Sequence, residues 1–408
     1  MSNNCKILND PIYGLIEIPY GIIYDLLEHR FYQRLRRINQ LGFTQYVYPG
    51  ATHTRFNHTI GALHLMQKAI RTLQSKGVDI SAEEAEATCI AILLHDIGHG
   101  PFSHCLEYNL VPIEHEELSI AFMEKLNEEF GGKLSLAIQI FENEYPKKFL
   151  HQLLSGQLDM DRMDYLTRDS FFTGVLEGVV GYDRIIKMLH VHNGELVIEH
   201  KGLYSVESFL VSRRLMYWQV YLHKTVVCAG EMTIRAIARA RDLLRKGHQL
   251  DISKSLHYFF SNDFSKDSLK TDAEKILYNF SMLDDTDILS ALKGFCEEDD
   301  FILSFLSKGL ISRKLFRVIM QNEPFDHNFI EKIKQKTLAQ FPINEDELEY
   351  LVFGGQESNK AYVTGSKEIM IKLASGDVKP MSEWSEHNIR PQEVVKYFIC
   401  YPKTVSLD

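Results

Sequence analysis

The feature that most constrains this chain is a ten-residue segment, His95-Asp-Ile-Gly-His-Gly-Pro-Phe-Ser-His104, which combines three histidines with one carboxylate. It follows the apolar run from Ala87 to Leu94, which predicts a buried helix ending at this segment. Neighbouring side chains at a helix end diverge by about 100°, yet His95 and Asp96 can both reach one ion beyond that end. Mixed imidazole and carboxylate ligands suit manganese, iron, nickel or zinc. The segment therefore predicts part of a metal site that handles a charged substrate.

Further ligands are expected from other parts of the chain. Seven of the 17 histidines fall between His53 and His115. Offsets of zero, three, four and seven place one group of side chains within an arc of about 100° on a single helix face: Asp161, Asp164, Tyr165 and Arg168. Taken singly, each such residue is more often an ordinary core histidine or an ion-pair partner. Taken together they predict one divalent cation, either a transition metal or magnesium, held by His58, His95, Asp96 and Asp161.

Most of the chain is predicted to be helical. Apolar residues recur at helical spacing after Asn57, and Ser81-Ala-Glu-Glu84 is a capping box that begins the helix carrying the apolar run to Leu94. Another helix is expected over residues 114–129, and a long one over 205–244 with a break near Gly230. Shorter helices joined by acidic loops are expected over 251–340.

A smaller share of the chain is predicted to form strands. Asn193-Gly194 predicts a type I′ turn between the strands of a hairpin. Three apolar stretches beyond Pro342 also predict strands, at 348–353, 368–373 and 394–401. We therefore expect a mainly α fold with a small β-hairpin. Its helical core covers residues 1–340, with the metal motifs in 50–170, and a C-terminal α+β lobe covers 341–408.

Composition excludes several classes of protein. No apolar stretch approaches the roughly 20 residues that span a bilayer, and the first residues lack the basic-then-apolar pattern of a secretion signal. The six cysteines are scattered without a Cys-x-x-Cys pair, which is typical of reduced thiols in a cytoplasm. The net charge of -10 makes nucleic acid an unexpected partner. We expect a cytoplasmic protein without a membrane segment.

Several ordered landmarks resemble one family, the HD-domain phosphohydrolases, and in particular the deoxynucleoside triphosphate triphosphohydrolases. The similarity runs from Lys6 to about Lys224, and more faintly to Val318. Besides the histidine segment, its landmarks are Asn9-Asp-Pro-Ile-Tyr-Gly14, Phe31-Tyr-Gln-Arg-Leu-Arg36, Tyr46-Val-Tyr-Pro-Gly50, Arg55-Phe-Asn-His58, Glu114-His-Glu116 and Asp159-Met-Asp-Arg-Met-Asp-Tyr165. The resemblance implies a helical HD fold, the four metal ligands named above, and hydrolysis of a dNTP to a deoxynucleoside and inorganic triphosphate.

The resemblance also implies roles for single residues. His115 would protonate the leaving 5′-oxygen, with His99, His104 and Glu116 around the reacting phosphate. Glu107 stands where relatives carry an aspartate. The residues matching those that hold the triphosphate are Arg55, Arg162 and Arg213. The residues matching those that bind the deoxyribose are Gln40, Leu41, Tyr165 and Asp169. Tyr221 matches a residue beside the base. Tyr217 stands where relatives can place a histidine.

Helical spacing supports a nucleotide site independently. Arg213, Tyr217, Tyr221 and Lys224 lie at offsets of zero, four, eight and eleven, which is one face of the expected long helix. Cations at the ends and phenol rings between them suit phosphate and base, although a partly buried tyrosine seam has the same pattern.

Related triphosphohydrolases bind an activating guanine nucleotide at their subunit contacts. Residues of this chain that match or neighbour that pocket are Lys6, Asn9, Glu28, Gln33 and Arg36. The resemblance therefore implies a guanine nucleotide activator and a homodimer or homotetramer.

Two other functions stay open on the sequence alone. One is an HD phosphohydrolase for a monophosphate, a cyclic nucleotide or an alarmone, although Ile97-Gly-His99 lacks the alarmone enzymes' Glu-Asp and no Gly-Tyr-Pro motif occurs. The other is a regulator that binds nucleotides or nucleic acid through a vestigial HD site, for which the basic segment His29 to Arg37 is suited.

Overall fold

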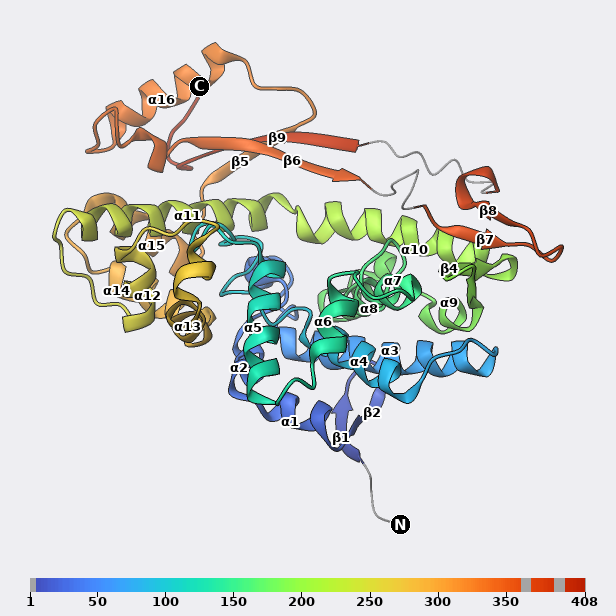
Figure 1. Cartoon of the computed structure of the whole chain (residues 1–408). Helices are drawn as coiled ribbons and strands as arrows, with labels where there is room; N and C mark the ends of the chain where they lie inside the picture. The colour runs from blue at the N-terminus through green and yellow to red at the C-terminus, as the bar shows by residue number, and fades with distance from the viewer. Residues whose placement is uncertain (1–4, 361–367, 385–392, 408) are drawn as a thin grey trace.

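The structure is a computed structural model that describes residues 5–360, 368–384 and 393–407. Helices make up most of the described chain, and short strands form small sheets (Figure 1). The expected mainly α fold with a hairpin and a C-terminal α+β part is confirmed. Within the described residues, no helix is both long and apolar enough to cross a membrane.

The helices are α1 (Ile22–Glu28), α2 (Arg30–Gln33), α3 (Arg55–Ser75), α4 (Ala82–Leu94), α5 (His115–Glu129), α6 (Ser135–Phe141), α7 (Lys148–Leu154), α8 (Met160–Thr173), α9 (Tyr182–Met188), α10 (Leu203–Met216), α11 (Lys224–Arg245), α12 (Lys254–Ser261), α13 (Ser268–Ser281), α14 (Asp285–Phe295), α15 (Phe301–Ile311) and α16 (His327–Gln340). The strands are β1 (Cys5–Asp10), β2 (Gly14–Pro19), β3 (Leu189–His192), β4 (Glu195–Glu199), β5 (Arg317–Gln321), β6 (Phe353–Lys360), β7 (Met370–Lys372), β8 (Val378–Pro380) and β9 (Glu393–Tyr401). Short 3-10 turns are η1 (Arg34–Arg37), η2 (Gly42–Tyr46), η3 (Leu176–Gly178), η4 (His200–Gly202), η6 (Leu348–Tyr350) and η7 (Met381–Glu383), and η5 (Tyr217–Tyr221) is a π-helical turn.

Helix α3 forms the centre of the core and packs against α4 and α8. The apolar residues that predicted it are buried, among them Ile60, Leu63 and Met66. Its N-terminus is fixed by Thr54, whose backbone N–H donates to the side-chain oxygen of Asn57 at 3.0 Å. These three helices bring the separate metal motifs into one region of the core.

Helix α4 begins at the predicted capping box. The backbone N–H of Glu84 donates to Ser81 Oγ at 3.1 Å, and the backbone N–H of Ser81 donates to Glu84 Oε2 at 2.8 Å. The helix ends at Leu94, so His95 forms its C-cap. The metal motif therefore begins where a buried helix stops.

The predicted hairpin is confirmed as β3 and β4. Asn193 and Gly194 have φ angles of 51° and 83°, the left-handed values that a type I′ turn requires. Strand β7 adds to β4 in parallel and β8 pairs with β7, so the C-terminal region extends this sheet.

The predicted break near Gly230 is wrong. The helical path is interrupted instead at η5 and at Leu222, and α11 starts at Lys224. Gly230 lies inside α11, where a Cβ would come within 3.0 Å of the Sγ of Cys105. This glycine therefore serves close packing, and Lys224 does not share a continuous helix face with Arg213.

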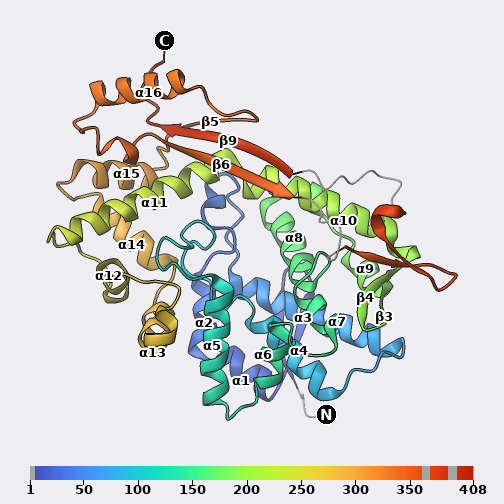
Figure 2. The same cartoon turned by 45° about the horizontal axis from the view of Figure 1, so that its top comes forward.

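The C-terminal sheet has the order β5-β9-β6, with both outer strands antiparallel to β9. Figures 1 and 2 show this sheet lying along α11. The stretch expected over 251–340 as helices only also contains β5, and the strand expected at 348–353 begins only at Phe353, because residues 348–350 form a 3-10 turn. The division of the chain at residue 341 stays a prediction.

Candidate active site

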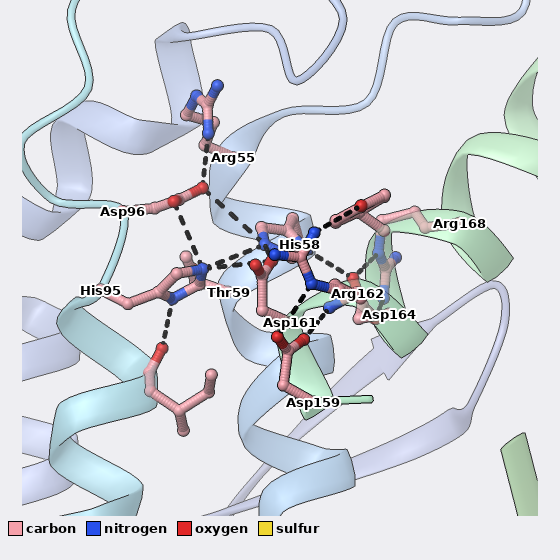
Figure 3. Close-up of polar contacts among 12 residues, drawn as sticks. Arg55, His58, Thr59, His95, Asp96, Asp159, Asp161, Arg162, Asp164 and Arg168 are labelled. Atoms are coloured by element: carbon pink, nitrogen blue, oxygen red, sulfur yellow. Dashed lines mark hydrogen bonds and ion pairs between the residues drawn. The ribbon is translucent and has the colours of Figure 1, made fainter. Parts of the chain in front are cut away.

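Three predicted metal ligands converge from three helices (Figure 3). His58 stands on α3, His95 at the end of α4 and Asp161 in the first turn of α8. The Nε2 atoms of the two histidines are 3.3 Å apart. An oxygen of Asp161 lies 3.0 Å from His58 Nε2 and 3.4 Å from His95 Nε2. These ligand atoms could hold one metal ion.

Asp96, the fourth predicted ligand, flanks the same centre. One of its oxygens lies 3.3 Å from His95 Nε2 and the other 3.8 Å from His58 Nε2. Arg55 Nη1 donates to Asp96 at 2.5 Å, and Arg55 Nε donates to the hydroxyl of Ser103. Arg55 therefore fixes the direction of the Asp96 carboxylate.

The hydrogen bonds of the two histidines suit metal binding. His95 Nδ1 lies 2.7 Å from the carbonyl oxygen of Ile92, which can only accept, so Nδ1 is the donor. His58 Nδ1 lies 2.8 Å from the carboxylate of Asp164. Both Nε2 lone pairs are thereby directed to the centre, the arrangement in which histidines bind metals. The donor set fits a divalent cation but does not decide which one.

The charges of the cluster are strongly coupled. Burial alone would lower the pKa of His58, but hydrogen bonds to Asp161 and Asp164 raise it to about 10. Burial would likewise raise the pKa of Asp161, yet its contacts with His58 and His95 hold it below the ordinary value. Carboxylates surrounding these imidazoles therefore favour positive charge at this point, which a proton or a metal ion can supply.

A buried series of charged side chains contacts His58 on its Nδ1 side, away from the predicted metal position. Arg168 donates to both oxygens of Asp164 at 3.0 Å and to Asp10 at 2.8 Å. Gly61 makes room for these side chains, since a Cβ there would lie 2.0 Å from an oxygen of Asp164. Asp10, at the end of β1, was not predicted as part of the site.

The predicted general acid lies beside the metal cluster. His115 begins α5, and its Nδ1 lies 2.5 Å from Glu107. Its ring stacks on that of His99 at 3.9 Å between centroids, and His99 Nε2 is 3.3 Å from Asp96. Burial would lower the pKa of His115, but the hydrogen bond and charge of Glu107 raise it. Glu107, which stands where relatives carry an aspartate, therefore contacts His115 directly.

The other residues predicted near the reacting phosphate lie around this pair. Glu116 Oε1 is 3.3 Å from His115 Nε2. His104 is exposed, with its ring centroid 5.9 Å from that of His115 and its Nδ1 3.6 Å from Glu107.

A cavity of about 570 Å³ connects the metal cluster to the predicted nucleotide residues. Arg55 is 1% exposed, and its Nη2 has no hydrogen-bond partner among the described residues. Such a buried donor is suited to an anion entering the cavity. The predicted substrate residues that line the cavity are Gln40, Leu41, Arg55, Arg162, Tyr165, Asp169, Tyr217 and Tyr221.

Arg213 is not brought to the cavity wall with the others. Its guanidinium lies 5.8 Å from the ring centroid of Tyr217. Arg162, in contrast, lines the cavity, although its Nε also contacts Asp159 at 3.1 Å. The predicted triphosphate contacts are therefore only partly assembled in this structure.

Tyr221 is held by Asp169, which was predicted as a substrate residue, and through it by His53, which was not. Its hydroxyl donates to Asp169 at 2.7 Å, and His53 Nε2 lies 2.7 Å from the other oxygen of that carboxylate. His53 was counted among the clustered histidines but was given no role. Its hydrogen bond to a residue 116 positions away has no local sequence signal.

The residues predicted for an activator lie on the N-terminal surface elements. Lys6 and Asn9 are exposed on β1, and Glu28 is exposed at the end of α1. Gln33 accepts a hydrogen bond from Arg36 Nε at 2.8 Å. Gln33 and Arg36 are therefore hydrogen-bonded to each other.

Comparisons with known proteins show which family the chain resembles. Residues 55–169 match the HD domain and residues 180–254 the HD associated region. The uncharacterized protein YwfO of Bacillus subtilis (strain 168) is 32% identical over 78% of this chain and 72% of that protein. The deoxynucleoside triphosphate triphosphohydrolase SAMHD1 homolog of Dictyostelium discoideum is 30% identical over 61% of this chain and 52% of its own length.

A crystal structure of a phosphohydrolase from Bacteroides thetaiotaomicron VPI-5482 has the same fold. Its TM-score is 0.94 at 48% sequence identity, covering 98% of this chain and 100% of that one. The chain belongs to the HD-domain phosphohydrolase family, and the resemblance predicted from its motifs is confirmed.

Gly98 offers a test of how His115 is positioned. A Cβ at Gly98 would lie 2.2 Å from the carbonyl oxygen of His115 and 2.4 Å from the backbone nitrogen of Ser119. Because these are backbone atoms, Gly98→Ala is expected to push α5 away, lower stability by about 1–3 kcal/mol and reduce hydrolysis while metal binding persists. Denaturation, metal analysis and activity assays measure these effects. Gly181→Ala, with open space around its Cβ, is the control, and equal behaviour of both variants would contradict the expectation.

Proposed function

We propose that the protein hydrolyses dNTPs to deoxynucleosides and inorganic triphosphate with the help of one divalent cation. The observation that carries the proposal is the cavity itself. It joins the metal-binding cluster and His115 to the Nη2 of Arg55, which no described residue pairs, and to the tyrosines of α8 and η5. The Dictyostelium relative, a deoxynucleoside triphosphate triphosphohydrolase homolog, supports the same substrate class.

In the proposed reaction, a water oxygen bonds to the α-phosphorus and loses a proton to the solvent, and the bond from phosphorus to the 5′-oxygen breaks. His115 donates its proton to that 5′-oxygen, which is otherwise a poor leaving group. Arg55 and Arg162 neutralise the triphosphate, and Gln40 and Tyr165 orient the sugar. His58, His95, Asp96 and Asp161 would hold the divalent cation, which would supply Lewis-acid polarisation of a phosphoryl oxygen.

Product identification tests this reaction. The purified protein is incubated with each dNTP and NTP in the presence of manganese, and the products are separated by anion-exchange chromatography. Release of triphosphate from dNTPs supports the proposal. Release of monophosphate or pyrophosphate indicates another nucleotide hydrolase of the same family, and binding without turnover indicates a regulator.

We extend the proposal to an activating guanine nucleotide at Lys6, Asn9, Glu28, Gln33 and Arg36, in a dimer or tetramer. Their shared N-terminal location and the pairing of Gln33 with Arg36 support one surface site. Activation by dGTP of the hydrolysis of another dNTP, measured together with the oligomeric state, tests it. Rates independent of dGTP would count against it.

Glu107→Gln is expected to move the pH dependence of kcat/KM. His115 acts while protonated, so the rate falls as the pH rises through its pKa. Glu107 raises that pKa, so its removal should shift the alkaline limb to lower pH. Glu117→Gln, at an exposed position of α5, is the control. A limb that stays in place in the Glu107 variant would exclude His115 as the acid held by this carboxylate.

A further inference from the structure

The cavity continues beyond Tyr221 along one face of α11. Its lining includes Val226, Val227, Gly230, Glu231 and Ile234, whose spacings of three and four residues place them on one side of the helix. At 1.5 Å per residue, Glu231 lies about 10 Å along α11 from its first residue. This part of the cavity, which we call the α11 wall, is lined by a helix that carries none of the predicted metal ligands.

The C-terminal sheet borders the cavity beside the α11 wall. Glu357, on β6, lines the same cavity although it is 126 positions after Glu231. Figures 1 and 2 show β6 lying next to α11, which explains how Glu231 and Glu357 come to line one cavity. The sheet thus contributes a side chain to the substrate cavity as well as packing on the helix.

Few hydrogen-bond donors of the protein contact the carboxylates of Glu231 and Glu357. Arg235 Nη2 contacts Glu231 at 3.3 Å, but its guanidinium also lies 5.0 Å from the ring centroid of Phe353. Within the described part of the chain, the Glu357 side chain makes no hydrogen bond or ion pair. Burial raises the pKa of Glu357, and the charge of Glu231 raises it further. A ligand covering this pair must supply donors, because buried acceptors left unpaired are costly.

Charge decides which part of a nucleotide can lie here. A triphosphate is attracted to Arg55, Arg162 and the cation cluster and is repelled by two carboxylates. The apolar side chains of Val226, Val227 and Ile234 offer surface to a flat ring. The base, rather than the phosphates, is therefore the part suited to the α11 wall.

We propose that Glu231 and Glu357 read the base and favour guanine. The proposal rests on the proposed function, since it assigns the base end of the same cavity. Guanine presents N1–H and the 2-amino group side by side, and one carboxylate can accept from both. Adenine and cytosine place an acceptor nitrogen beside their amino group, and thymine has one N–H between two carbonyls. Of the four bases, only guanine presents two adjacent donors to the two oxygens of one carboxylate.

The comparison of dGTP with dITP isolates this contact. The two differ by the 2-amino group, so their kcat/KM ratio cancels general effects of charge on phosphate binding. With the full-length protein and manganese, we expect a ratio of about ten or more, as for a hydrogen bond to a charged group. Glu357→Gln should bring the ratio close to one, and Glu231→Gln should lower it. Ser358→Ala, at an exposed neighbouring position of β6, should leave it unchanged.

Two outcomes overturn the inference. One is a wild-type ratio of one, and the other is a ratio that both glutamine variants preserve. Equilibrium dialysis of dGTP and dITP in the presence of EDTA separates this inference from the proposed reaction. Selective dGTP binding without triphosphate release would leave base recognition standing and remove the reaction. Triphosphate release from every dNTP at equal kcat/KM would do the reverse.

Discussion

His95→Ala is expected to abolish metal binding and hydrolysis together. The Nε2 of His95 lies within 3.4 Å of ligand atoms from both His58 and Asp161, so its loss removes one wall of the cluster. If the cation contributes about 4 kcal/mol or more to transition-state stabilisation, kcat falls at least about a thousandfold. Metal content measured by mass spectrometry and steady-state hydrolysis of a dNTP would show both losses.

The control for this variant is His248→Ala. His248 is exposed beyond the end of α11, so metal content and turnover should both remain. Circular dichroism would show that the two proteins are folded alike. Full turnover by a metal-free protein with both His95→Ala and Asp96→Ala would contradict a role for the cation.

The convergence of His58, His95 and Asp161 could be predicted because these residues lie in short segments with recognisable patterns. His95 and Asp96 are adjacent, and Asp161 begins a helix whose polar face has regular spacing. Helical geometry links residues three and four apart, so such patterns survive in the sequence. The convergence of α3, α4 and α8 brings these segments together.

The supporting contacts could not be predicted because they join distant segments. Asp10 meets Arg168 across 158 positions and His53 meets Asp169 across 116. Glu357 reaches the cavity only because the C-terminal sheet lies against α11. Taken alone, the residue type at each of these positions is common on protein surfaces or in cores, so it gives no sign of the distant contact.

In the fold, too, features determined by neighbouring residues could be predicted, and features determined by distant residues could not. The hairpin at Asn193 was predictable because the turn demands left-handed backbone angles. The break near Gly230 was misplaced because a glycine that ends a helix and one that admits a neighbour look alike in the sequence. Only the position of Cys105 against α11 tells them apart.

Asp164→Ala is expected to lower the free energy of unfolding by about 3–5 kcal/mol. Asp164 and Arg168 are both 0% exposed, and the variant would leave the arginine with Asp10 as its remaining carboxylate partner. His58 Nδ1 would also lose its acceptor, so metal affinity should fall by about 10- to 100-fold. Chemical denaturation and metal titration measure the two effects.

The matched control is Asp183→Ala, which removes the partner of Lys68 from a surface pair. The carboxylate side chain of Asp183 is 58% exposed, so the loss should stay within about 1 kcal/mol. The two variants should also differ in pH dependence. Burial alone would raise the pKa of Asp164, but Arg168 and His58 hold it below its ordinary value. Its contribution is therefore present above about pH 4 and is lost as the pH falls. If both variants lost equally little stability, the buried charges behind His58 would not be what holds the metal cluster in place.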